Sequence, residues 1–136
     1  MALVEWNDKL SVGVGSIDDQ HQHLVNLLNQ LHDAMVEGCG AEIVGPALKG
    51  LIDYTANHFK YEEELFARTG YAEGVAHKKE HIELVNRILE VQKTYNKKGP
   101  KILTLHVRNF LKDWLTGHIQ GSDQKYVAHL KAKGVR

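Results

Sequence analysis

Residues 48–66 read LKGLIDYTANHFKYEEELF, and their apolar side chains recur at the three- and four-residue steps of an amphipathic helix. His58 and Glu62 lie four residues apart in this run, so both side chains fall on one side of the predicted helix. A stretch from Thr69 to Gly74 that contains two glycines follows, and such a stretch is typical of a helix end. The run therefore predicts a helix that carries a histidine and a carboxylate near its carboxyl end.

Three further segments repeat this apolar spacing, and breakers separate all four. The apolar positions of the four segments span residues 17–35, 48–66, 84–91 and 103–114. The breakers fall at residues 38–40, 69–74 and 97–100, where glycines and Pro100 interrupt the pattern. Four similar helices joined by short loops predict an all-α fold, an antiparallel up-down-up-down four-helix bundle.

The two ends of the chain complete a predicted single domain of residues 1–136. Residues 1–16, which include the run Val12-Gly13-Val14-Gly15, are expected to form an extended N-terminal arm. A short C-terminal helix is expected from Ser122 to about Lys133.

Composition excludes several classes of protein. The 136 residues include 17 Lys+Arg and 17 Asp+Glu, and this zero net charge argues against nucleic-acid binding. No apolar run approaches the roughly 18 residues of a membrane span, and the N-terminus carries acids where a signal peptide needs cations. The single cysteine, Cys39, is expected as an exposed loop thiol without an internal disulfide partner. We therefore expect a cytoplasmic protein without membrane insertion.

Nine histidines in 136 residues are unusual, and five of them fall on the predicted inner faces. His77 and His81 are four residues apart and share one side of their helix. His21 lies on the apolar stripe of the first segment, and His118 lies on that of the last. In an up-down-up-down bundle these positions lie at the same end as His58 in the second segment. Histidines from four helices are thus predicted to meet at one level.

Asp123 is the second carboxylate that we expect at this level. It follows His118 by five residues, which is a poor helical match, but Gly121 and Ser122 supply a break that turns its carboxylate toward the bundle. Burying so many titratable groups without a metal would cost several kcal/mol. The predicted metal ligands are His21, His58, Glu62, His77, His81, His118 and Asp123.

The donor types restrict the metal. Imidazole and carboxylate without thiolate suit Fe, Mn, Zn or Ni. Seven such side chains are too many for one tetrahedral zinc ion. They fit two six-coordinate metals bridged by both carboxylates and by an oxygen from water, which leaves one position open for a small ligand.

Four motifs carry a resemblance to a known family. They are IDDQH at 17–21, HFKYEE at 58–63, HKKEH at 77–81 and HIQGSD at 118–123. Together they resemble the hemerythrin family, in particular its bacterial branch, and the resemblance runs from Trp6 to about Tyr126. It implies a non-haem di-iron site that binds O2 reversibly.

The resemblance also implies how the ligands divide between the irons. His77, His81 and His118 would hold one iron, while His21 and His58 would hold the other, which keeps the open position. Glu62 and Asp123 would bridge the two irons together with an oxo or hydroxo group.

An apolar O2 pocket over the open iron is implied as well. By the resemblance it consists of Leu24, Phe59, Trp114, Leu115 and Ile119. From spacing alone, Trp114 and Leu115 stand about one turn before His118, at the right height. Ordinary core packing explains the same residues equally well.

The expected function is reversible O2 binding for storage, transport or delivery in the cell, without enzyme activity. Oxygen-activating di-iron bundles usually carry two Glu-x-x-His motifs, and this sequence has none. The alternatives are a di-iron oxidase or peroxidase, or an O2 or redox sensor that acts through a partner protein. We expect a monomer whose partner is O2, with an oxygen-consuming protein as a further candidate partner and no nucleic acid.

The four remaining histidines are not predicted to be ligands. His23 lies far around the helix from His21 and should face solvent. His32 shares the stripe of His21 but lies about 16 Å along the axis, so a core or end-cap position is expected. His106 and His129 have no partner at a ligand spacing.

Overall fold

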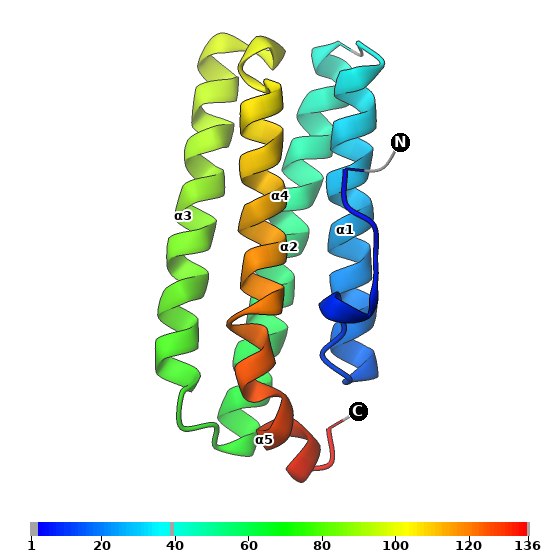
Figure 1. The fold of residues 1–136 in the computed structure, drawn as a ribbon. Helices are drawn as coiled ribbons and strands as arrows, with labels where there is room; N and C mark the ends of the chain where they lie inside the picture. Colours follow the sequence, from blue (N-terminus) through cyan, green and yellow to red (C-terminus); the bar gives the residue numbers. More distant parts are fainter. Residues whose placement is uncertain (1–2, 39, 136) are drawn as a thin grey trace.

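Four long antiparallel helices form the molecule, and they run alternately up and down (Figure 1). The computed structural model describes residues 3–38 and 40–135. The main helices are α1 (Gly15–Val36), α2 (Ala41–Thr69), α3 (Gly74–Lys98) and α4 (Leu105–Gln120). The predicted all-α four-helix bundle is confirmed. Cys39, for which an exposed loop thiol was expected, lies outside the described residues.

Short elements occupy the connections and the C-terminal end. They are the 3₁₀ helices η1 (Asp8–Leu10), η2 (Pro100–Ile102) and η3 (Asp123–Tyr126) and the helix α5 (Val127–Ala132). Together η3 and α5 form the expected short C-terminal helix. Figure 1 shows α5 at the end of the bundle where α1 begins and where α2 is joined to α3.

The N-terminal arm packs along α1 (Figure 1). Val4 donates its backbone N–H to Asn29 Oδ1 at 2.9 Å, and Asn29 Nδ2 donates to the Val4 carbonyl at 2.8 Å. The arm is shorter than the predicted 1–16, because α1 begins at Gly15, and it contains the turn η1. Asp18 holds the end of the arm by accepting from the Val12 backbone N–H at 2.7 Å.

Local sequence sets where the helices end. Gly70 and Gly99 follow α2 and α3 with φ of 68° and 81°, a backbone conformation that favours glycine. The Thr104 hydroxyl caps α4 by accepting from the Val107 backbone N–H. Leu103, which we assigned to the last helical segment, is buried but lies just before this cap.

The buried apolar side chains form two clusters, one on each side of the predicted ligand level. The larger cluster fills the bundle from Leu24 and Ile119 toward the α1–α2 connection. The smaller cluster lies at the other end and includes Ile17, Phe66 and Tyr126. None of the described helices combines the length and apolar character that a membrane span requires. The polar ligand level therefore lies between two layers of apolar side chains.

Candidate metal centre

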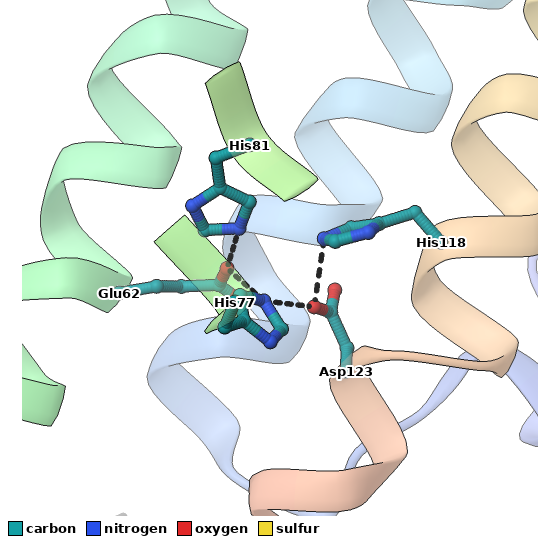
Figure 2. Close-up of side chains that lie close together, drawn as sticks. All are labelled: Glu62, His77, His81, His118 and Asp123. Carbon is teal, nitrogen blue, oxygen red and sulfur yellow. Dashed lines mark ion pairs between the residues drawn. The ribbon is translucent and has the colours of Figure 1, made fainter. Parts of the chain in front are cut away.

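All seven predicted ligands come together in one buried group. They arrive from α1, α2, α3, α4 and η3, and none is more than 9% exposed. Figure 2 shows five of them, with the side chains of Glu62 and Asp123 pointing toward the imidazole rings. The bundle topology thus places at one height the residues that the sequence spreads over 103 positions, from 21 to 123.

The helical repeat and one break in helix geometry explain how these side chains converge. His77 and His81 lie one turn apart on α3, so both rings face the same side. Helix α4 ends at Gln120, and Gly121 leaves helical geometry with φ −96° and ψ −81°. The following 3₁₀ turn η3 begins at Asp123 and buries its carboxylate completely. The predicted break therefore does turn Asp123 back toward the bundle.

Asp123 faces two different groups of histidines with its two oxygens. Its Oδ1 lies 3.0 Å from His77 Nε2 and 3.0 Å from His118 Nε2. Its Oδ2 lies 3.1 Å from His21 Nε2.

Glu62 divides its oxygens in the same way. Its Oε1 lies 3.1 Å from His81 Nε2 and 3.7 Å from His77 Nε2. Its Oε2 lies 3.4 Å from His58 Nε2 and 3.6 Å from His21 Nε2. Each carboxylate thus presents one oxygen to a three-histidine group (His77, His81, His118) and the other to a two-histidine group (His21, His58). A carboxylate placed in this way can bridge two metal ions.

The nitrogen and oxygen atoms at the centre of the group are placed for binding metal ions, not for hydrogen bonds with one another. The Nε2 atoms of all five histidines, both Asp123 oxygens and Glu62 Oε1 are buried without a hydrogen-bond partner. Their separations of 3.0–3.7 Å lack hydrogen-bond geometry. Buried polar atoms normally find partners, so unpaired atoms that converge on shared points are expected where cations bind. The donors form two sets around the shared carboxylates, one of five residues and one of four.

The electrostatics of the site also favour positive charge. Burial lowers the pKa of His21 and of His77, but the adjacent carboxylates outweigh burial and raise each pKa to about 9. Burial acts to raise the pKa of Glu62, yet the charge of His58 and the other histidines hold this pKa well below its usual range. Burial likewise acts to raise the pKa of Asp123, and the surrounding histidines hold it low. Two buried carboxylates remain ionised and require cations beside them.

Hydrogen bonds from outside the ligand group orient the side chains. His58 Nδ1 lies 2.7 Å from Gln20 Oε1, and His81 Nδ1 lies 2.9 Å from Glu63 Oε2. In both rings Nδ1–H donates outward, so Nε2 is free to face the centre. Tyr126, fully buried, donates its hydroxyl to Glu62 Oε2 at 2.5 Å. We did not predict these three roles, although Gln20 and Glu63 each stand next to a predicted ligand in the sequence.

A small cavity adjoins one side of the centre. Its volume is about 10 Å³, close to the space that one water molecule needs. All five residues expected in the O2 pocket line it, and Thr55 and Leu84, which were not predicted, line it too. The lining residues are His21, Leu24, Thr55, His58, Phe59, Leu84, Trp114, Leu115, His118, Ile119 and Asp123. Both residues of the two-histidine group line the cavity, whereas only His118 of the other group does.

Aromatic and indole contacts fix the cavity wall. The Phe59 ring stacks on His81 with ring centroids 3.8 Å apart and an interplanar angle of 1°. Trp114 donates its Nε1–H to the Leu84 carbonyl of α3 at 3.0 Å. The wall is therefore held by specific contacts on α2, α3 and α4.

The remaining histidines lie away from the centre, as expected. His23 is exposed and packs on the Tyr54 ring. His32 is half-buried, with its Nδ1 3.1 Å from Arg108 Nη1, and His129 Nε2 lies 3.0 Å from Thr69 Oγ1. None belongs to a described set of metal-ligand donors.

Comparison with known proteins connects this geometry to a family. The family model described as the hemerythrin HHE cation binding domain matches residues 12–130. A bacteriohemerythrin of Methylococcus capsulatus is 38% identical over 133 residues, covering 97% of this chain and 100% of the relative. One of Stenotrophomonas maltophilia is 36% identical over 132 residues, covering 97% and 84% respectively. A crystal structure of wild-type hemerythrin superposes with a TM-score of 0.86 at 36% identity, covering 95% of this chain and 98% of that one. Because the model and the relatives match along nearly the whole length, the chain belongs to the hemerythrin family.

Proposed function

We propose that this protein binds O2 reversibly at a non-haem di-iron centre. His77, His81 and His118 would hold one iron, His21 and His58 the other, and Glu62 and Asp123 would bridge them. The division of each carboxylate between the two histidine groups supports this ligand set. The nitrogen and oxygen donors suit iron, and membership of the family favours it.

The iron pair, when bound, supplies the electrons for reversible O2 binding. The chain supplies the enclosure and the charges. Two ionised carboxylates offset part of the positive charge of the metals, and neutral imidazoles fill the remaining positions without adding negative charge. Gln20 and Glu63 hold the rings of His58 and His81 in the orientation that binding needs.

The cavity beside the two-histidine group is the observation that carries the proposal. Apart from the ligands it is lined mainly by apolar side chains, and its volume of about 10 Å³ suits a small apolar guest such as O2. Leu24, Trp114, Leu115 and Ile119 exclude water, and without water proton and anion exchange at the site are slow. Slow exchange favours release of O2 over loss of a reduced oxygen species.

The same cavity favours a carrier over an oxidase that acts on an organic substrate. Pockets for organic substrates usually measure about 300–1,000 Å³. The cavity at this centre is far smaller, so an organic substrate has no room beside the proposed open position. Sensing through a partner protein would use the same O2 site.

Iron content and O2 uptake test the proposal together. The purified chain should hold about two irons, the number that the two donor sets accommodate. Its reduced form should take up one O2 per iron pair and then stop, even with an electron donor present. One iron per chain would contradict the bridged centre, and sustained O2 consumption well above the rate of spontaneous oxidation would favour the oxidase.

A further inference from the structure

The two histidine groups have unequal surroundings. In the three-histidine group, His81 Nδ1 lies 2.9 Å from the carboxylate of Glu63, which is 25% exposed. His118 Nδ1 in the same group lies 3.7 Å from the carboxylate of Glu80. Two of the three rings thus face an acid on the side away from the centre.

Within the described part of the chain, the two-histidine group has no acid in the equivalent positions. His58 Nδ1 faces the neutral side-chain amide of Gln20 at 2.7 Å. His21 Nδ1 is buried and has no hydrogen-bond partner among the described residues. This group therefore lacks the outer negative charge that the other group has.

Tyr126 adds to the difference through Glu62. Its hydroxyl donates to Oε2, the oxygen that faces His58 and His21, and leaves Oε1 without a hydrogen bond. A donated hydrogen bond draws electron density from the oxygen that accepts it, so Oε2 is the weaker donor of the two.

All these contacts make the donors of the three-histidine group stronger than those of the two-histidine group. A carboxylate that accepts the outer N–H of an imidazole raises the basicity of the inner nitrogen, and a neutral amide does so less. The number of donors adds to this effect, because the three-histidine set has five residues and the two-histidine set has four.

We propose that the two metal positions are unequal and fill in order, the three-histidine position first, and that Gln20 keeps the position beside the cavity weak and exchangeable. This inference rests on the proposed two-metal centre. Gln20 and Glu63 are positioning residues in it, since each acts through a histidine. The exchangeable metal is then the one that faces the cavity, where the open position is proposed.

Zinc is a suitable probe, because it binds the same donor types and has no redox chemistry. The full chain is loaded with zinc, and ¹⁵N signals of the histidine side chains are recorded as zinc is removed. When one equivalent remains, His77, His81 and His118 should keep the Nε2 shifts of metal-bound rings. His21 and His58 should have lost them.

The release rate to a coloured chelator gives a second readout. The wild-type chain should release zinc in two phases of equal amplitude, separated by about 10–100-fold in rate, the range that outer hydrogen bonds typically control. Glu63→Gln should speed the slow phase by about 10-fold, and Gln20→Glu should slow the fast phase by a similar factor.

Matched controls carry the same charge changes at neighbouring exposed positions. Glu64→Gln and Gln22→Glu alter exposed residues, and both should leave the two phases unchanged. A tighter site in Gln20→Glu is informative because general loosening of the bundle would speed release.

Several results would overturn the inference. They are release of both zinc ions at one rate, histidine signals that show half-occupancy of both groups at one equivalent of zinc, or faster zinc release in Gln20→Glu. Two zinc ions released in a single phase would contradict the inference but would be consistent with the proposed two-metal centre. Failure to bind a second zinc ion at all would contradict the proposed two-metal centre as well.

Discussion

Glu62 is the residue on which the centre depends most. It is fully buried, it presents one oxygen to each histidine group, and Tyr126 fixes its orientation. In the proposed centre a terminal histidine would support one metal, whereas this carboxylate would support two and offset positive charge at both. Its loss should therefore affect both metals.

Glu62→Ala should reduce the bound iron from about two per chain to nearly none, whereas His58→Ala should leave the three-histidine position loaded. Metal analysis of the purified variants measures this. Glu64→Ala is the matched control, because Glu64 is exposed on the same helix. Two irons and normal O2 binding in Glu62→Ala would contradict the bridging role.

Trp114→Ala should shorten the life of the oxygenated protein by about 10-fold or more without removing iron. The smaller side chain opens the cavity wall and admits water, which promotes oxidation of the metals. Decay of the O2-dependent absorption band measures the effect. Leu105→Ala, at an exposed position on the same helix, should behave as wild type. Equal lifetimes in both variants would argue that the wall does not exclude water.

At the residue level, spacing and topology predicted the seven ligand candidates, whereas the family resemblance implied the five pocket residues. The structure brings both sets together. Helical spacing identifies residues that share a face, and topology identifies faces that meet. The role of Tyr126 could not be predicted in this way, since its partner Glu62 is 64 positions away and its hydroxyl could serve either core packing or a hydrogen bond. The same applies to Gln20, whose partner is 38 positions away.

At the scale of elements, the C-terminal turn and helix act as a cover for the centre. Asp123 and Tyr126 both lie in η3, and α5 packs Leu130 into the smaller apolar cluster with Ile17 of α1. The cover is therefore tied to the bundle by the centre on one side and by a small cluster on the other. Its order should depend on metal.

Removal of metal should loosen η3, α5 and the first turns of α1 more than the rest of the chain. Their buried polar groups lose their partners, while the larger apolar cluster at the other end is unchanged. Hydrogen exchange of metal-bound and metal-free protein measures this, and the carboxyl half of α1 serves as the internal reference. Uniform loss of protection along α1 would contradict the expected pattern, as would equal melting temperatures.

The order and direction of the helices were predictable, but several of their limits were not. Helix α2 begins at Ala41, before the predicted apolar positions, and accepts Pro46 near its start. Helix α4 begins at Leu105 because the Thr104 side chain caps it there. Caps and early prolines decide helix ends locally, whereas apolar spacing reports only the part of a helix that packs.

For the whole molecule, the charge of the centre links folding to pH when no metal is bound. The pKa of His21 and of His77 is raised to about 9 from an ordinary value of 6.5, so the folded protein holds these protons more tightly than the unfolded chain. Their contribution to stability is complete below about pH 6.5 and is lost as the pH rises through 9. In the proposed centre metal would take the place of these protons.

Metal-free protein should therefore lose stability between pH 6.5 and 9, while the metal-bound protein should change much less over the same interval. Denaturant unfolding of both forms at several pH values measures the difference. A metal-free protein whose stability stays constant or rises across this interval would contradict the assigned charges.

The central claim is reversible O2 binding at a di-iron centre beside an apolar cavity, and the visible absorption spectrum through repeated O2 cycles tests it most directly. The reduced protein without O2 should be nearly colourless. O2 should produce a visible band, and removal of O2 should erase it over several cycles without net consumption of O2. His21→Ala and His58→Ala should abolish the band, since both residues belong to the position that lines the cavity. Absence of an O2-dependent band, or a band that cannot be reversed by removing O2, would contradict the account.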